Sequence, residues 1–265
     1  MIDFHNHFIY DLDDGPGNID ESMDMIRTAY EQGITDIIQT VHFQHPKMEN
    51  KNIGIDYINK KIKKIEYRML EEKIDIKIHL AAEVFYLPNL LQIYSNPLVT
   101  LGNGKYMLIE FTTNIFPVNY EEEFYKIQNK GISPIIAHPE RYRFVQNDLN
   151  ILDKWISKDF IIQLDAGSLL GQFGEKIKKI SYDIIEMYGI HLIGSDAHNN
   201  KKRNFCLSET YNLLSKKYND TIVETLKDNS LSLLNGNKMS LIPLKQKHSL
   251  LKNIKSKFAR LIKYK

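Results

Sequence analysis

The feature that most constrains this chain is a series of short apolar segments that lead into a histidine or an acid. Segments of this length and composition are typical of buried strands. They cover residues 2–4, 34–40, 76–82, 106–109, 133–137, 160–165 and 190–194. Between them lie stretches with helical periodicity and helix-ending glycines, such as Gly33, Gly131 and Gly189. The chain therefore reads as strands that alternate with helices.

The expected helices cover residues 20–32, with Asp20 as N-cap, and then 55–72, 88–94, 120–129, 149–157, 175–188, 204–217 and 221–229. Alternation of this kind is typical of an α/β fold built from parallel βαβ units, either an open sheet or a closed barrel. An open sheet gathers ligands at one switch point, from few strands. Here six of the seven segments deliver a candidate ligand at the carboxyl edge. This distribution favours a barrel-like ring.

Both ends of the chain carry aspartate and histidine at alternate positions. Asp3, His5 and His7 alternate along the first segment, and Asp196 and His198 follow the last one. In extended chain, residues i and i+2 point the same way, so each set is expected to aim at one point. We therefore expect a closed fold that brings both ends to one site.

Imidazole and carboxylate groups at strand ends are candidate ligands for Zn, Mn or Fe. A lone strand-end histidine or glutamate is more often structural, but five of the nine histidines share this placement. Nine ligands suit two or three ions, with a carboxylate such as Glu83 as a bridge. His45, His79, His191 and His248 lack the placement and are taken as surface or core residues, and Asp165 is not expected to be a ligand. The candidates are His5, His7, Asp14, His42, Glu83, Glu110, His138, Asp196 and His198.

Two arginines lie close to these ligands in the sequence. Arg141 follows His138 by three residues, and Arg203 follows His198 by five. A guanidinium group binds phosphate oxygens bidentately, although a solvated salt bridge is the ordinary role of a surface arginine. Their position beside the ligands favours a substrate-binding role.

Composition narrows the class of protein further. The 265 residues contain one cysteine, Cys206, which excludes an internal disulfide framework and fits a cytoplasmic protein. No apolar run reaches the roughly 20 residues that span a bilayer, and the N-terminus does not resemble a signal peptide. Eight of the 35 Lys/Arg and none of the 33 Asp/Glu lie from Lys245 onward, so the remainder, with 27 bases and 33 acids, carries a charge of −6. No nucleic-acid partner is expected.

The basic C-terminal tail is a separate feature. We expect one domain over residues 1–243 and a basic amphipathic tail over 244–265. Leu250, Ile254, Phe258 and Leu261 would share one face of a helix among lysines. Such a helix either contacts an anionic membrane peripherally or docks on the body.

Seven blocks of this sequence, in order from Met1 to about Asn237, resemble one family. It is the PHP-superfamily tyrosine-protein phosphatases of bacterial capsular and exopolysaccharide gene clusters, the manganese-dependent CpsB/YwqE type. Val41 and the 43–46 loop depart from its pattern and bear on substrate preference. The blocks are Met1-Ile2-Asp3-Phe4-His5-Asn6-His7, Asp13-Asp14-Gly15, Thr40-Val41-His42, Ala82-Glu83, Ile109-Glu110-Phe111, Ala137-His138-Pro139-Glu140-Arg141 and Gly194-Ser195-Asp196-Ala197-His198-Asn199.

The resemblance implies a distorted (β/α)7 barrel, the PHP fold, with three divalent ions, Mn²⁺ foremost and Fe or Zn as alternatives. It assigns His5, His7, Glu83 and Asp196 to one ion, Glu83, Glu110 and His138 to a second, and Asp14, His42 and His198 to a third. Arg141 and Arg203 would bind the phosphate.

The expected reaction is hydrolysis of phosphotyrosine on a protein, such as the tyrosine-rich tail of a membrane-anchored bacterial tyrosine kinase. A metal-bridged hydroxide would attack phosphorus, with Asp14 or a metal-bound water as suggested general acid. Because residues 207–212, directly after Cys206, contain no arginine to build a phosphate loop, a phosphocysteine route is disfavoured. Two alternatives stay open: a small-molecule phosphatase such as a histidinol-phosphatase, and a weakly catalytic metal-binding regulator of polysaccharide assembly. The oligomeric state, a homo-oligomer included, is also open.

Overall fold

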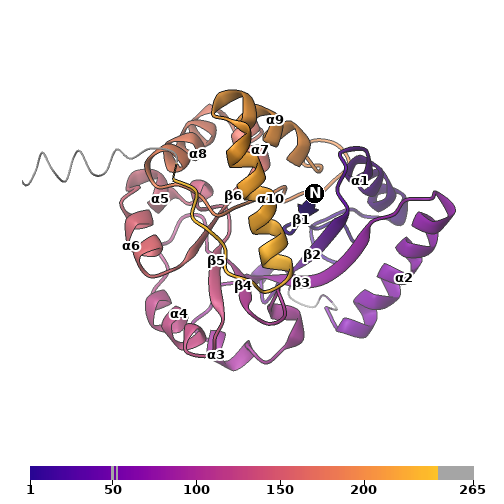
Figure 1. The fold of residues 1–265 in the computed structure, drawn as a ribbon. Helices are drawn as coiled ribbons and strands as arrows, with labels where there is room; N and C mark the ends of the chain where they lie inside the picture. Colours follow the sequence, from indigo (N-terminus) through magenta and orange to yellow (C-terminus); the bar gives the residue numbers. More distant parts are fainter. Residues whose placement is uncertain (49–50, 52, 244–265) are drawn as a thin grey trace, which may run out of the picture.

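Seven parallel strands form the centre of the molecule (Figure 1). The computed structural model describes residues 1–48, 51 and 53–243; the predicted tail, 244–265, lies outside the described residues. The strands are parallel, as the alternation predicted, and they pair in sequence order; β2 and β3 share the longest register, from Asp36↔Lys77 to Phe43↔Val84. They are β1 (Ile2–Asp3), β2 (Asp36–Phe43), β3 (Lys77–Phe85), β4 (Tyr106–Glu110), β5 (Ser133–Ile136), β6 (Ile161–Asp165) and β7 (Leu192–Gly194).

The first and last strands approach each other just beyond their carboxyl ends. The backbone N–H of Asp196 donates to the carbonyl of His5 at 2.7 Å, and the N–H of His7 donates to the carbonyl of Ala197 at 2.7 Å. A single parallel bridge, Asn6↔Ala197, accompanies these bonds. The sheet is therefore a nearly closed barrel, and the expectation that both chain ends meet at one place is confirmed.

Helices surround the strands (Figure 1). Helix α1 begins after Asn18, whose side chain accepts from the N–H of Glu21 at 3.0 Å, so the predicted N-cap, Asp20, was wrong. Helix α10 is longer than predicted, and α5 and α7 were not predicted. The helices are α1 (Ile19–Glu31), α2 (Ile55–Glu71), α3 (Leu90–Ile93), α4 (Tyr120–Gln128), α5 (Arg143–Asn147), α6 (Ile151–Ser157), α7 (Ala166–Leu170), α8 (Glu175–Met187), α9 (Leu207–Lys217) and α10 (Asp220–Leu234), with 3-10 turns at Pro46–Met48, Pro97–Val99 and Pro139–Arg141.

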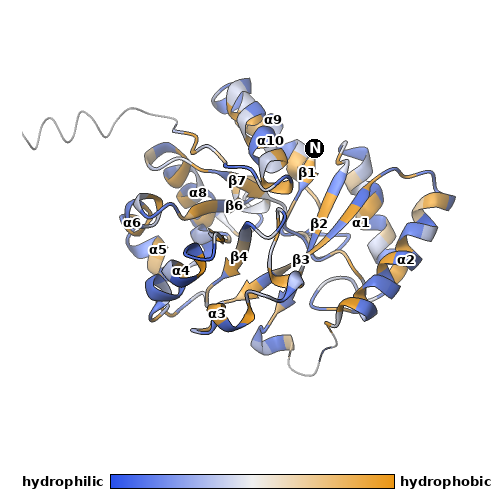
Figure 2. Ribbon diagram, turned by 60° about the horizontal axis from the view of Figure 1, so that its bottom comes forward, coloured by the Kyte–Doolittle hydropathy of each residue, from blue (hydrophilic) through white to orange (hydrophobic). Residues whose placement is uncertain are grey.

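Strand alternation divides the core in two. Ile37 faces outward toward the helices, whereas its neighbour Ile38 faces into the barrel. The interior cluster takes a residue from each of the seven strands or its flank and is completed by Leu233 of α10, which covers the amino end of the barrel. Hydrophobic colour runs along much of the strands in Figure 2. The interior members are Phe4, Ile38, Ala81, Leu108, Ile135, Ala137, Ile161 and Leu192.

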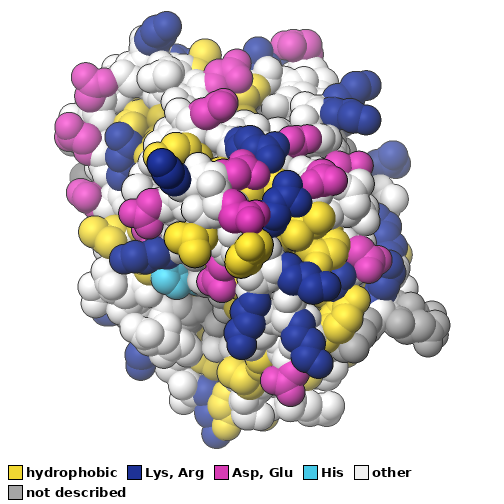
Figure 3. Space-filling view, turned by 90° about the vertical axis from the view of Figure 1, so that its right-hand side faces the viewer, with side chains coloured by type: hydrophobic (Ala, Val, Ile, Leu, Met, Phe, Trp, Pro, Cys, Tyr) yellow, Lys and Arg dark blue, Asp and Glu magenta, His cyan; other side chains and the backbone are white. Residues whose placement is uncertain are grey.

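The outer surface near α1 and α2 carries charges of both signs. Figure 3 shows Lys and Arg interspersed with Asp and Glu and with hydrophobic side chains on this face. Several are paired, as Arg27 is with Glu72 and Arg68 with Asp20. Across the described part of the chain, no helix is long and apolar enough to cross a membrane.

Candidate metal centre

The barrel brings all nine candidate ligands to one end. His5 and His7 follow β1, His42 and Glu83 lie near the ends of β2 and β3, and Glu110 ends β4. His138 follows β5, and both Asp196 and His198 follow β7, whereas Asp14 comes from the loop between β1 and α1. Parallel strands place their carboxyl ends together, which is why residues far apart in sequence meet here.

The first group consists of His5, His7, Glu83 and Asp196, with one potential ligand atom each within 4.8 Å of the others. Nε2 of His5 lies 3.2 Å from Oε1 of Glu83 and 3.4 Å from Oδ1 of Asp196. Nε2 of His7 lies 3.3 Å from Oε2 of Glu83 and 3.5 Å from the same Asp196 oxygen. All four side chains are buried. The structure thus assembles the four residues that the resemblance assigned to one ion.

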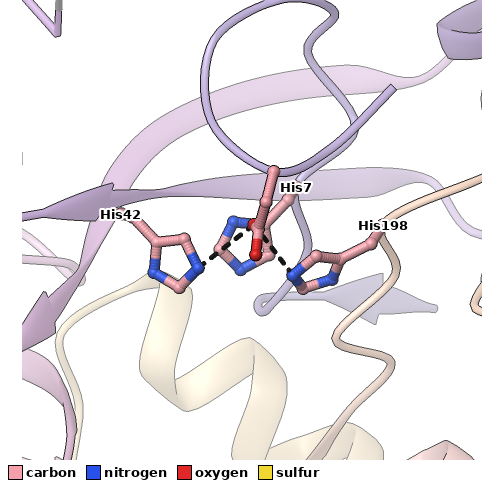
Figure 4. A group of neighbouring side chains, drawn as sticks. His7, His42 and His198 are labelled. Carbon is pink, nitrogen blue, oxygen red and sulfur yellow. Dashed lines mark ion pairs between the residues drawn. The ribbon is translucent and has the colours of Figure 1, made fainter. Parts of the chain in front are cut away.

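The second group consists of His7, Asp14, His42 and His198 (Figure 4). Oδ1 of Asp14 lies 3.2 Å from Nε2 of His42 and 3.2 Å from Nε2 of His198, the two ion pairs drawn as dashed lines. The ring of His7 lies between the two other imidazoles. Asp14 is the most exposed member, with 37% of its side chain accessible. His7 joins the set that the resemblance implied, and it belongs to the first group as well.

The third group differs from the expected one. It consists of His42, Glu83 and Glu110, whose ligand atoms lie within 4.8 Å of one another, where the resemblance implied His138 in place of His42. His138 is nevertheless close: its Nε2 lies 3.0 Å from Oε1 of Glu83 and 3.9 Å from Oε1 of Glu110. Glu83 stands at the centre of all these contacts, because its Oε1 faces His5 and His138 while its Oε2 faces His7 and His42.

Two residues that the sequence analysis did not assign hold the imidazoles in place. Nδ1 of His5 lies 3.0 Å from Oε1 of Gln163, and Nδ1 of His7 lies 2.8 Å from Oδ2 of Asp13. A hydrogen bond at one ring nitrogen fixes the tautomer and points the other nitrogen at the centre. Two sequence features point to these residues: Asp13 adjoins Asp14, and Gln163 is a polar residue in an apolar strand.

The backbone at Asp196 is not extended. Its φ is +45°, in the left-handed region, and His138 also has a positive φ of +32°. The expected extended backbone was therefore wrong, although both side chains reach the cluster, with Nδ1 of His198 3.4 Å from Oδ1 of Asp196. The left-handed turn lets Asp196 enter the first group and His198 the second. Positive φ at residues other than glycine is sparsely populated and concentrates at functional sites.

Arg141 and Arg203 both reach this end of the barrel through Asp196. Nη1 of Arg141 is paired with Oδ2 of Asp196 and lies 3.3 Å from Oδ2 of Asp165. Nη2 of Arg203 lies 2.7 Å from the same Asp196 oxygen. The ring of Phe173 lies beside both guanidinium groups, with its centroid 4.8 Å and 5.5 Å from their Cζ atoms. Asp165 belongs to none of the ligand groups found among the described residues; it anchors Arg141 and caps α7.

His45 was taken as a surface or core residue, and the structure places it at the edge of the cluster instead. Its ring centroid lies 4.8 Å from that of His42, and its Nε2 lies 3.9 Å from Oε2 of Glu110. Burial, followed by the charge of His42, lowers the pKa of His45 to about 4. The residue comes after the end of β2, so its approach depends on the loop and not on strand alternation.

The electrostatics of the cluster are those of crowded buried charges. Burial, and then the charge of Glu83, raise the pKa of Glu110 to about 8. Burial alone would lower the pKa of His5, but the charges of Glu83 and Asp196 raise it to about 9. Burial alone would raise the pKa of Glu83, but His5 and His138 hold that pKa well below the usual range. These shifts show that positive charge in the cluster stabilises the buried carboxylates in their ionised form.

The residues fit divalent ions. Several buried atoms that face the centre have no hydrogen-bond partner among the described residues, including Nε2 of His5, Nε2 of His7 and Oδ1 of Asp196. Unpaired buried polar atoms are rare in folded proteins and indicate a missing ion or water. Mixed imidazole and carboxylate donors, with a carboxylate facing two sides, are the ligands that Mn, Fe or Zn use in multinuclear sites.

A parallel seven-stranded barrel with a histidine–carboxylate cluster at its carboxyl end is the architecture of metal-dependent barrel hydrolases. Residues 1–235 match the model of the family described as capsular polysaccharide synthesis, CpsB/CapC. The chain belongs to this family, as the sequence motifs predicted.

Relatives and solved structures agree with this membership. The chain is 34% identical to the tyrosine-protein phosphatase YwqE of Bacillus subtilis over 88% of this chain and 91% of that one. It is 29% identical to the tyrosine-protein phosphatase CpsB of Streptococcus pneumoniae over 82% of this chain and 91% of that one. A crystal structure from a study of YwqE and CpsB, described there as metal-dependent tyrosine phosphatases, superposes with a TM-score of 0.85 at 33% identity. It covers 92% of this chain and 98% of the other.

Proposed function

We propose that this protein is a metal-dependent protein-tyrosine phosphatase. The observation that carries the proposal is the position of Asp196. One of its carboxylate oxygens faces His5 and His7, while the other binds Arg141 and Arg203. A ligand group for a cation and a pair of phosphate-binding arginines therefore share one side chain. A phosphate bound by the two arginines would therefore lie close to the proposed cation, which supports the proposal.

The proposed ligands are the nine residues predicted from the sequence. Glu83 is the proposed bridge, because its two oxygens face different pairs of imidazoles. His5, His7, Glu83 and Asp196 would hold one ion, and Asp14, His42 and His198 a second, with His7 at their boundary. Glu110 and His138 would complete a third position beside Glu83. Manganese is the proposed metal, and two or three ions are expected.

When bound, divalent ions of this kind activate water and neutralise charge on phosphoryl oxygens. The chain's own contribution is to bind and orient the phosphate. Arg141 and Arg203 present guanidinium N–H groups, and both are preorganised by Asp196. A tyrosine leaving group has a pKa of about 10, far less basic than a serine alkoxide, so the reaction needs little proton donation. Asp14 as general acid stays a prediction; hydrogen bonds from His198 and His42 outweigh its burial and lower its pKa, which suits a ligand better.

Cys206 does not suit the role of nucleophile. Its side chain is buried, at the position preceding α9, and burial strongly raises the pKa of the thiol. A phosphocysteine mechanism requires a thiolate, which this environment disfavours. Phosphoryl transfer to water is the route that the geometry supports.

We further propose a cytoplasmic substrate: a phosphotyrosine protein, and specifically a membrane-anchored bacterial tyrosine kinase of a polysaccharide pathway. Membership of a capsular polysaccharide synthesis family supports this choice. Contact of the tail with an anionic membrane would bring the enzyme to such a substrate. Loss of liposome binding after deletion of residues 244–265 would support that contact, and no binding by the intact chain would contradict it.

The test combines metal analysis with a phosphatase panel. The purified full chain is assayed with Mn²⁺, Fe²⁺ or Zn²⁺ against phosphotyrosine peptide, phosphoserine peptide and histidinol phosphate. We expect bound metal, hydrolysis of the phosphotyrosine peptide and loss of activity with a chelator. Preference for histidinol phosphate would instead indicate a small-molecule phosphatase. Bound metal without hydrolysis of any substrate would indicate a regulator, and absence of bound metal would contradict the proposal.

A further inference from the structure

A groove of about 590 Å³ opens beside the arginine that is proposed to bind phosphate. Arg141 and Phe173 line it, and so do Arg143 and Lys176. Arg141 therefore borders both the groove and the metal centre, where it is paired with Asp196. The groove is therefore open to the atoms that neighbour a phosphate bound at Arg141.

The groove is formed by two elements whose positions are fixed. On one side, the N–H of Arg143 donates to the carbonyl of Thr113 at 2.8 Å, which ties the start of α5 to the loop after β4. Gln146 of α5 donates to the carbonyl of Glu140 at 3.0 Å. The other side is formed by Phe173, which precedes α8, and by Lys176 in the first turn of α8. The two cations thus extend from a defined backbone frame.

These two cations differ from neighbouring helix cations that are paired with acids. Lys179, one turn further along α8, pairs with Asp183 at 2.5 Å, and Lys126 of α4 pairs with Glu122 at 2.8 Å. Within the described part of the chain, neither Arg143 nor Lys176 has an ion pair with a carboxylate, and no aspartate or glutamate lines the groove. The groove therefore contains three cations and, of these, Arg141 alone is neutralised by neighbouring acids.

We propose that this groove is a second anion subsite, in which Arg143 and Lys176 bind a negatively charged group close to the phosphotyrosine in the substrate. The inference rests on the proposed phosphatase function and names its substrate class: a phosphotyrosine flanked by further negative charge. A carboxylate and a second phosphate would both satisfy these cations, since Arg and Lys bind either group. A phosphotyrosine within neutral residues would gain nothing from the groove.

The test compares three phosphotyrosine peptides that differ only in the flanking residues: neutral, glutamate or a second phosphotyrosine. With the full metal-loaded chain at low salt, we expect a lower KM for at least one anionic peptide than for the neutral one. Exposed ion pairs contribute modestly, so about threefold per cation is expected, and the advantage should shrink as salt rises. The more favoured peptide identifies the source of the negative charge.

Substitution then assigns the effect to the groove. Arg143→Gln with Lys176→Gln should abolish the preference for anionic peptides, while hydrolysis of para-nitrophenyl phosphate, which lacks a flanking group, stays unchanged. Lys179→Gln, which removes a paired cation from the same helix, is the matched control and should retain the preference.

Equal KM values for all three peptides, or a preference that survives the double substitution, would overturn the subsite. Failure of the unaltered chain to hydrolyse any phosphotyrosine peptide or para-nitrophenyl phosphate would overturn the phosphatase function instead. The two results are therefore distinguishable.

Discussion

At the carboxyl end of the barrel, some imidazole nitrogens have no hydrogen-bond partner among the described residues although a carboxylate lies close by, as is the case for Nε2 of His5 beside Glu83. At the amino end, His191 is satisfied by the protein: its Nδ1 accepts from the N–H of Ile162 at 3.1 Å, and its carbonyl accepts from Asn229 at 2.7 Å. Burial lowers the pKa of His191 to about 4, so it is neutral, whereas carboxylates raise the pKa of His5 to about 9. The same buried residue type is structural where the chain completes its hydrogen bonds and a candidate ligand where it does not.

The largest effect is expected from Glu83→Gln. The change keeps the shape of the side chain but removes the charge that four imidazoles face. We expect loss of bound metal and about a thousandfold lower kcat/KM, measured by elemental analysis and phosphotyrosine hydrolysis. Full metal content with full activity would remove Glu83 from the proposed bridge.

Arg141→Lys should come next. Lysine keeps the positive charge beside Asp165 and Asp196 but loses the planar fork that binds two phosphate oxygens. We expect about a hundredfold lower kcat/KM with metal content unchanged. If activity fell only in proportion to metal content, Arg141 would be a support for the ligands and not a phosphate-binding residue.

Phe173→Leu should have a smaller effect. The ring covers both guanidinium groups, and leucine removes that cation–π contact while staying apolar. We expect about tenfold lower kcat/KM, mostly in KM for phosphate-containing substrates, and rescue by Phe173→Trp. A loss that tryptophan does not restore, or one seen only in thermal stability, would contradict a positioning role.

Asn229→Ala tests the amino end of the barrel. Asn229 donates to the carbonyls of His191 and Ser240 and accepts from the N–H of Ser240, so its loss leaves buried groups without partners. We expect the free energy of unfolding to fall by about 1–3 kcal/mol, measured by urea denaturation. The kcat/KM of the folded enzyme should not change; a large drop would mean that the two ends are coupled.

Cys206→Ala should have the smallest effect. The thiol is buried, with a raised pKa, and takes no part in the proposed reaction. We expect activity on phosphotyrosine peptide within about twofold of the original, with chelator sensitivity retained. Complete loss of activity with the metal still bound would restore a cysteine mechanism.

The sequence predicted the seven strands because short apolar segments between helices identify buried parallel strands, and it predicted the site because parallel strands end together. It missed Gln163, Asp13 and His45 because their contacts depend on which face a strand turns inward and on how a loop folds. The turn at Asp196 was missed for a related reason: a positive φ at a residue other than glycine leaves little trace in sequence. Phe173 was missed because it follows no strand.

The junction of His5 with Asp196 has a consequence for synthesis on the ribosome. The N-terminal ligands are made first, but their partners after β7 emerge only when most of the domain has been translated. A chain released before residue 196 would contain His5, His7 and Glu83 but would lack Asp196 and the backbone pairing of Asn6 with Ala197. Tight metal capture at the proposed site would thus depend on a finished domain. Because an ion held by both ends would stabilise the folded chain, capture would also distinguish full-length molecules from fragments.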